Sequence, residues 1–163
     1  MKNKKIICHD IHNNKTEVDS SQLIFRPSIY GILIENNKIL LSKQWDGYDF
    51  PGGKIDIHET IEETLKREFY EETGVKIELI KPIHCETSFF NPNYSAKRIG
   101  EYCNCPLIYF SVKKIGGNLS KDNISKEEQD YIDAPEWINL NEIDSIKFYN
   151  SVDSIKVIKK ALR

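Results

Sequence analysis

The chain has 163 residues, 39% of them hydrophobic and 29% charged, and its formal net charge at pH 7 is −2. This composition is ordinary for a globular protein, and the length suits a single domain over residues 1–163. The slight negative charge excludes the basic surface that long nucleic acid or an anionic membrane would need. Apolar runs stay far below the roughly 20 residues that cross a bilayer, and the N-terminus lacks the pattern of a signal peptide. We therefore expect a cytoplasmic protein without a membrane partner.

The first part of the chain predicts a short N-terminal segment followed by a β-hairpin. Residues 1–22 are polar and are expected to be an extension or an edge strand. Residues 28–35 and 38–43 are apolar runs of strand length. The two asparagines between them tolerate the positive φ that a tight hairpin turn requires. Residues 48–50 can add a short strand before a Pro-Gly-Gly turn.

The clearest helix signal lies at residues 61–73. Thr60 and Glu63 have the spacing of a capping box, in which each side chain accepts a hydrogen bond from the other residue's backbone N–H. Gly74 stands where a left-handed residue commonly ends a helix. The sequence therefore predicts both the start and the end of this helix.

Three glutamates in this helix are hard to explain by folding alone. On a helical wheel the apolar face is formed by Ile61, Leu65 and Phe69. Glu68 and Glu72 fall on that same face, and Glu71 lies at its flank. Carboxylates that face a core are costly without a cationic partner, and the helix dipole disfavours negative charge in the last turn. A divalent cation resolves both penalties, so the residues alone indicate a metal site.

The second part of the chain predicts further strands and a final helix. Residues 75–89 and 102–113 alternate as strands do, and residues 136–138 form a short strand. Asn150 or Ser151 is expected to cap a C-terminal amphipathic helix. Its apolar stripe consists of Val152, Ile155, Ile158 and Leu162. Strands on both sides of a central helix, with a second helix at the end, indicate an α/β fold with a mixed sheet between helices. The four cysteines are expected to be free thiols.

The central stretch has a specific spacing of charged and small residues. It reads Gly53-x5-Glu59-x7-Arg67-Glu68-Phe69-x-Glu71-Glu72-x-Gly74-Val75. At every defined position this resembles the signature of the Nudix (MutT-like) hydrolases, G-x5-E-x7-R-E-U-x-E-E-x-G-U, in which U is aliphatic or aromatic. The resemblance extends over about residues 24–162, so only the N-terminal segment lies outside it.

The resemblance implies a Nudix-type α/β/α sandwich and a metal-dependent hydrolase that cleaves a diphosphate linkage in a nucleoside diphosphate derivative. The cofactor would be Mg²⁺ or Mn²⁺. The implied metal ligands are Glu68, Glu72, Glu71 and the carbonyl oxygen of Gly52. Arg67 would orient Glu71 or Glu59. These are the same glutamates that the helical wheel places against an apolar face.

The reaction also needs a general base that removes a proton from the attacking water. Glu72, Glu68 and a loop acid, either Glu127 or Glu128, are the candidates, and the choice among them stays open. The resemblance thus assigns catalytic roles to Glu72, Glu68, Arg67 and Glu71. The attacked phosphorus and the number of metal ions are not fixed by the sequence.

Substrate selectivity lies outside the signature in this family. The candidates for substrate contact are Phe25, Arg26, Trp45 and Phe90. The main hypothesis is a nucleoside triphosphate or a modified nucleotide. One alternative is an ADP-ribose or nucleotide-sugar pyrophosphatase, because Pro92 lies close to where ADP-ribose-hydrolysing members carry a proline. A second alternative is a non-catalytic nucleotide-binding domain. The expected partner is therefore a small nucleotide, and the sequence leaves a homodimer open.

Overall fold

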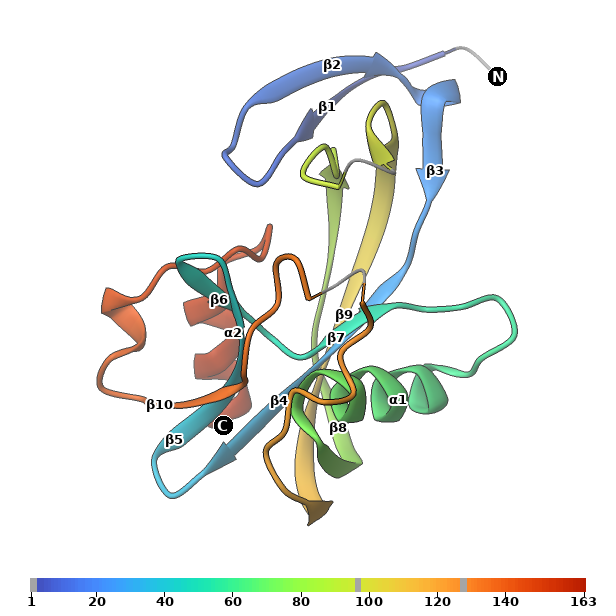
Figure 1. Cartoon of the computed structure of the whole chain (residues 1–163). Helices are drawn as coiled ribbons and strands as arrows, with labels where there is room; N and C mark the ends of the chain where they lie inside the picture. The colour runs from blue at the N-terminus through green and yellow to red at the C-terminus, as the bar shows by residue number, and fades with distance from the viewer. Residues whose placement is uncertain (1–2, 96–97, 127–128) are drawn as a thin grey trace.

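The computed structural model describes residues 3–95, 98–126 and 129–163 (Figure 1). The strands are β1 (Lys5–His9), β2 (Lys15–Asp19), β3 (Leu23–Phe25), β4 (Ser28–Glu35), β5 (Lys38–Gln44), β6 (Gly47–Asp49), β7 (Gly52–Lys54), β8 (Val75–Phe90), β9 (Tyr102–Gly117) and β10 (Glu136–Asn139). The helices are α1 (Ile61–Thr73) and α2 (Ser154–Ala161). Short 3₁₀ turns lie at Ser20–Gln22 and Ile143–Ser145.

The strands pair into one mixed sheet with the order β10-β5-β4-β9-β8-β1-β2. Strand β9 is its central member, because it pairs antiparallel with β8 on one side and parallel with β3 and then β4 on the other. The short strands β6 and β7 pair with β5 and β4. The β1–β2 hairpin continues the sheet beyond β8 and lies away from both helices in Figure 1.

The two helices bury opposite faces of this sheet. Residues of β4 alternate between the two sides, as side chains of a strand do. The cluster beside α1 includes Ile29, Leu33, Leu65 and Phe69. The cluster beside α2 includes Ile32, Ile39, Val157 and Ile158. The predicted α/β/α sandwich with a mixed sheet is confirmed.

Local signals predicted the hairpin and the first helix correctly. Asn36 and Asn37 have φ values of 49° and 60°, which build the tight turn between β4 and β5. Thr60 Oγ1 accepts from the N–H of Glu63 at 3.2 Å, and Glu63 Oε2 accepts from the N–H of Thr60 at 2.8 Å. Gly74 ends α1 with φ 72°. The predicted capping box and C-terminal glycine are therefore both confirmed.

Two details of the helices differ from the prediction. Ile61 is 42% exposed, because the first turn of α1 extends past the apolar surface that covers Leu65 and Phe69. Helix α2 is capped by Asp153, whose side chain accepts from the N–H of Lys156 at 2.9 Å. Asn150 does not serve as its cap because α2 begins four residues later, at Ser154, and the side chain of Asn150 is instead hydrogen-bonded within the pocket described below.

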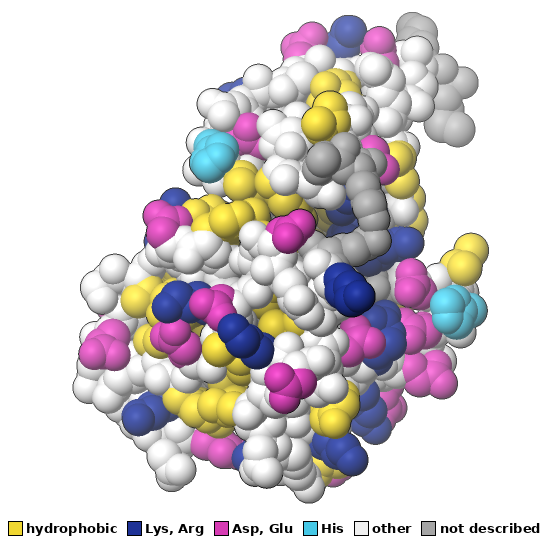
Figure 2. Space-filling model, in the orientation of Figure 1, with side chains coloured by type: hydrophobic (Ala, Val, Ile, Leu, Met, Phe, Trp, Pro, Cys, Tyr) yellow, Lys and Arg dark blue, Asp and Glu magenta, His cyan; other side chains and the backbone are white. Residues whose placement is uncertain are grey.

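The stripe predicted for α2 is also corrected. Ile158 is buried as predicted, but Val157 is the second fully buried side chain of α2, and Leu162 is 55% exposed. The four cysteine thiols are free, as expected. Lys, Arg, Asp and Glu side chains are interspersed over the face shown in Figure 2. Within the described ranges, no helix is both long and apolar enough to cross a membrane.

Candidate active site

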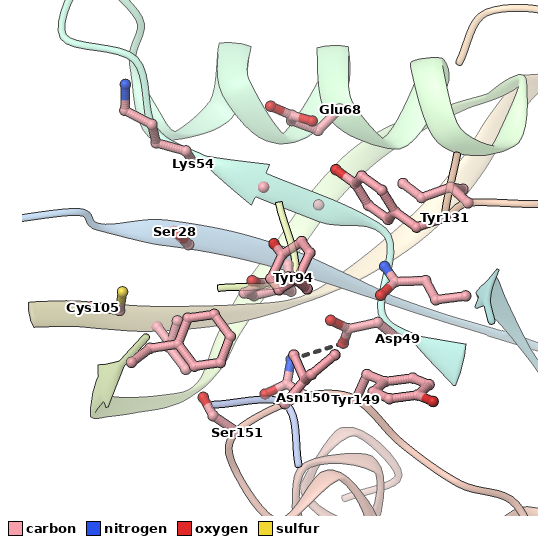
Figure 3. Close-up of a pocket in the computed structure, with 18 of the residues that line it drawn as sticks. Ser28, Asp49, Lys54, Glu68, Tyr94, Cys105, Tyr131, Tyr149, Asn150 and Ser151 are labelled. Carbon is pink, nitrogen blue, oxygen red and sulfur yellow. Dashed lines mark hydrogen bonds between the residues drawn. The ribbon is translucent and has the colours of Figure 1, made fainter. Parts of the chain in front are cut away.

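A pocket opens between the C-terminal half of α1 and the loops at one end of the sheet (Figure 3). Its lining includes Glu68 and Glu72 from α1, Gly52 and Gly53 from β7, and Arg26 from the segment before β4. Figure 3 shows Glu68 on one side of the hollow and Asn150 and Ser151 on the other. The pocket thus joins the glutamate helix to segments from distant parts of the chain.

The two inward glutamates lie where the helical wheel placed them. Glu72 is 4% exposed, and the hydroxyl of Ser42 on β5 donates to its Oε2. The side chain of Glu68 is 12% exposed and accepts from Arg67 Nη1 at 3.0 Å. Both carboxylates reach the pocket because α1 packs its apolar face against β4 and β8, which turns its last two turns toward β7.

Two glycines let β7 pass between β4 and the carboxylate of Glu68. Gly52 has φ 148°, and a Cβ built on it would lie 2.1 Å from the carbonyl oxygen of Ile29. A Cβ on Gly53 would lie 2.7 Å from Cδ of Glu68. Neither position has room for a side chain, so the glycines allow the backbone of β7 to approach the carboxylate directly.

Arg67 connects the acids of this region. Its Nε and Nη2 donate to the two carboxylate oxygens of Glu59, each at 2.7 Å, and its Nη1 donates to Glu68 at 3.0 Å and to Glu71 at 3.1 Å. The hydrogen bond from Arg67 lowers the pKa of Glu59 to about 2. Arg67 therefore contacts both acids that the sequence assigned to it, and it also holds Glu68. A bidentate arginine of this kind fixes the positions of its partners.

The pocket has a third carboxylate besides Glu68 and Glu72, that of Asp49 at the end of β6. Burial raises the pKa of Asp49 to about 6, although hydrogen bonds from Asn150 Nδ2 at 2.8 Å and from the N–H of Phe50 at 2.7 Å act in the opposite direction. The carbonyl of the Asn150 side chain accepts from the hydroxyl of Tyr109 at 2.7 Å. Asn150 is therefore held in one orientation, with its amide on Asp49, as drawn in Figure 3.

An aromatic cluster closes one side of the pocket. Trp45 has a left-handed φ of 47°, which is rare for a bulky residue. Its ring stacks on Tyr131 with centroids 5.6 Å apart and meets Tyr149 at 4.7 Å and Tyr94 at 5.5 Å. These four rings come from four different loops. The backbone strain at Trp45 is maintained where these rings meet, as strained residues at binding sites often are.

The comparison with protein families agrees with the glutamate helix. A model of the NUDIX domain matches residues 25–160, which is most of the chain. The chain belongs to the Nudix family. It is a hydrolase by this membership, as the signature predicted, and members of the family generally use divalent metal ions.

Two relatives and one solved structure show what this Nudix hydrolase resembles. An 8-oxo-dGTP diphosphatase of Buchnera aphidicola subsp. Schizaphis graminum is 31% identical over 75% of this chain and 81% of its own length. An ADP-ribose pyrophosphatase of Methanocaldococcus jannaschii is 28% identical over 98% of this chain and 84% of its own length. A NUDIX hydrolase from Nitrosomonas europaea shares the fold with a TM-score of 0.64, 14% identity, and coverage of 84% of this chain and 88% of that one.

The Nudix residues offer an oxygen-only donor set that suits a hard divalent cation. Glu68, Glu72 and Gly52 line one pocket, whereas Glu71 is 37% exposed at its side chain and is paired with Arg67 on the helix surface. In residues 3–95, 98–126 and 129–163, no three His, Cys, Asp or Glu side chains are grouped closely enough to hold a metal. Three of the four predicted ligands thus line the same pocket, and the chemistry of their oxygen donors fits a divalent cation.

Of the four residues predicted to contact the substrate, three lie in the pocket and one does not. Arg26, Trp45 and Phe90 line the pocket. Phe25 does not, because its side chain projects from β3 and is 69% exposed. The two loop acids considered as general base, Glu127 and Glu128, lie outside the described residues.

The sequence assigned no site role to several residues that the structure brings to the pocket. These are Asp49, Lys54, Arg98, Tyr131, Tyr149 and Asn150. Asp49 stands two residues before Pro51 of the Pro-Gly-Gly turn, and an acid this close to the turn was the one signal in the sequence. Tyr131 and Tyr149 carry no local signal, because nothing in their neighbourhoods reveals that they meet Trp45.

Proposed function

We propose that this Nudix hydrolase cleaves a diphosphate linkage in a nucleotide derivative with the help of Mg²⁺ or Mn²⁺. The observation that carries the proposal is that Glu68, Glu72 and Gly52 line one pocket, to which aromatic and basic side chains also contribute. Such a pocket combines oxygen ligands for a cation that would bind the diphosphate with rings on which a base can stack. Glu71 would complete the ligand set by turning from Arg67 toward the pocket.

The side chains of this chain have defined tasks in that reaction. When bound, a divalent cation supplies charge neutralisation at phosphorus and activates water. Arg67 holds Glu68 and Glu59 in place. Arg26, Lys54 and Arg98 bring positive charge to the pocket, where the anionic diphosphate would lie. Glu72 and Glu68 remain the candidates for the general base within the pocket, and Glu127 and Glu128 remain candidates from the sequence.

The substrate we propose first is a nucleoside triphosphate or a modified nucleotide, which is the class named for the Buchnera relative. Water would attack phosphorus and release a nucleoside monophosphate and pyrophosphate. ADP-ribose is the second candidate, because the match to the Methanocaldococcus relative extends over nearly the whole chain. That reaction would release AMP and ribose 5-phosphate. The cytoplasmic location stays a prediction, and the oligomeric state stays open.

The proposal is tested by hydrolysis of 8-oxo-dGTP, dGTP, ADP-ribose and a UDP-sugar, with products separated by ion-exchange chromatography. In Glu72→Gln we expect kcat/KM to fall by at least about 100-fold, because a ligand carboxylate is lost while the amide can still accept from Ser42. Glu78→Gln is the matched control, since Glu78 pairs with Lys113 on the exposed surface. Undiminished hydrolysis by Glu72→Gln would contradict the assignment.

Metal binding is tested separately by thermal unfolding. Mg²⁺ at about 100 times its Kd should stabilise the native state by roughly 2.7 kcal/mol, which raises Tm by about 5–10 °C for a domain of this size. The shift should vanish in Glu72→Gln and persist in Glu78→Gln. If the wild-type melting temperature does not respond to saturating Mg²⁺ or Mn²⁺, the proposed metal site is wrong.

A further inference from the structure

The turn between β1 and β2, residues 10–14, is built around one buried carboxylate. The side chain of Asp10 accepts from the N–H groups of His12 at 2.8 Å and Asn14 at 2.9 Å, and from the side-chain amide of Asn14 at 2.9 Å. Asp10 is 7% exposed, although it lies in a surface hairpin. The turn therefore has a fixed shape, unlike a hairpin tip held only by its strands.

The same carboxylate fastens the turn to the loop after β8. Asn93 Nδ2 donates to Asp10 Oδ2 at 3.2 Å, and the N–H of Asn91 donates to the carbonyl of His9 at 2.9 Å. Burial acts to raise the pKa of Asp10, but hydrogen bonds from Asn14, His12 and Asn93 lower it to about 2. The carboxylate of Asp10 is thus ionised near neutral pH. Its hydrogen bond with Asn93 joins the turn to the loop that carries Tyr94 of the aromatic cluster.

The turn held by Asp10 carries Ile11, which lies at the candidate active site. Ile11 lines the pocket together with Phe90, Tyr149 and Asn150. It also lines an adjoining hollow with these same three residues and Ser151. Figure 3 places Asn150 and Ser151 across the pocket from Glu68. Ile11 therefore belongs to the end of the pocket that is remote from the glutamates.

The position of Ile11 in the chain separates it from the rest of the site. The Nudix domain match begins at residue 25, so the β1–β2 turn lies before it. The other residues at this end of the pocket come from the matched region. An apolar side chain from a segment that precedes the matched domain thus lines the end of the pocket that is remote from the glutamates.

We propose that the β1–β2 turn is a wall of the substrate pocket, in which Ile11 contacts the nucleobase and Asp10 is the positioning residue that holds Ile11 there. The ligand class rests on the proposed function. An apolar contact at the remote end selects among substrates by the group that is attached to the diphosphate, because the diphosphate itself is common to all of them. Ile11 is then a specificity-determining residue.

The test compares ligands with and without a nucleobase. In the otherwise wild-type chain with Mg²⁺, Ile11→Ala should weaken the binding of a non-hydrolysable α,β-methylene analogue of dGTP or of ADP-ribose, whichever binds, by about tenfold. Binding of inorganic tripolyphosphate, measured by the same calorimetry, should change less than about twofold. Ile24→Ala is the matched control, because Ile24 on β3 is 48% exposed and lies outside the pocket. It should leave the binding of all three ligands unchanged.

The role of Asp10 is tested by kinetics in the otherwise wild-type chain. Asp10→Asn should raise KM for the hydrolysed nucleotide by several-fold and change kcat less, whereas general damage to the fold would lower both the active fraction and kcat. Asp19→Asn is its control, since Asp19 lies in the same hairpin and pairs with Lys5 at the surface. If Asp10→Asn disrupts the hairpin, Ile11→Ala still decides the proposal.

Two results would overturn the inference. One is an unchanged nucleotide affinity in Ile11→Ala, and the other is an equal loss of nucleotide and tripolyphosphate binding. These results are distinct from a failure of the proposed function. A chain that binds a nucleotide but releases no product with Mg²⁺ or Mn²⁺ contradicts the hydrolysis, while the comparison of Ile11 variants by binding still stands.

Discussion

Replacing Gly53 by alanine should separate activity from stability in this protein. The added Cβ would lie 2.7 Å from Cδ of Glu68 and 2.8 and 2.9 Å from its two carboxylate oxygens. Non-bonded carbon atoms normally approach to about 3.5–4.0 Å, so the carboxylate has to move by roughly 1 Å. The obstacle is the far end of a flexible side chain, which can move without disturbing the backbone of β7.

The expected effects follow from that displacement. A misplacement of about 1 Å at a catalytic group lowers the rate by about 100-fold, so kcat for the preferred nucleotide should fall by that factor. The free energy of unfolding should change by less than about 1 kcal/mol, which corresponds to less than about 4 °C in Tm. Steady-state hydrolysis and thermal unfolding of the same preparation measure the two quantities.

Two other glycines provide the controls. Gly52→Ala places its Cβ 2.1 Å from the carbonyl oxygen of Ile29, and neither that backbone nor a φ of 148° can adapt, so unfolding should become easier by about 3 kcal/mol or more. Gly116→Ala meets no atom within 4 Å and should leave both activity and stability near wild type. A fully active Gly53→Ala, or one whose activity falls only because it unfolds, would refute the reasoning.

Two further predictions concern charged groups around the site. Arg67→Lys removes the planar fork that holds Glu59 and also contacts Glu68, so kcat/KM should fall about 10–100-fold; an undiminished rate would contradict an orienting role. Asp49 has a pKa of about 6 in the folded chain against its usual 3.8, so its ionisation destabilises the native state as pH rises between those values. The Tm of Asp49→Asn relative to that of wild type should therefore increase from about pH 4 to about pH 6, and this difference should stay constant above about pH 6. An equal difference at pH 4 and pH 7, measured by calorimetry, would show that the charge of Asp49 is not the cause.

The features that were predictable from the sequence are those whose causes are local. Thr60, Glu63 and Gly74 set the ends of α1 through hydrogen bonds and backbone angles within a few residues. The inward glutamates were found because a helix repeats every 3.6 residues, whatever it packs against. The helical period shows which side of α1 is apolar but not how far along the helix that side is covered. Ile61 was therefore grouped with Leu65, although Ile61 is 42% exposed in the structure.

The features that could not be predicted depend on pairing between distant segments. Asp49 and Asn150 are 101 residues apart in the chain and meet only because the loop before α2 crosses the end of β6. Asparagine is a favoured helix cap, so the sequence predicted that role for Asn150. Nothing near Asn150 in the sequence indicates that its side chain is hydrogen-bonded to Asp49 instead. Ile11 likewise reaches the pocket from a distant segment, in which the neighbouring Asp10 accepts a hydrogen bond from Asn93.

The central position of β9 in the sheet also affects how the chain folds during its synthesis. Residues 28–33 of β4 pair with residues 107–112 of β9, so β4 leaves the ribosome long before its partner exists. At typical translation rates the delay is about 4–16 s. Helix α1 carries its own caps and can form during this interval, but the apolar side chains of β4 have no complete sheet to join. The nascent chain therefore exposes an unpaired strand edge for seconds, and this is the stage at which a chaperone would act on it.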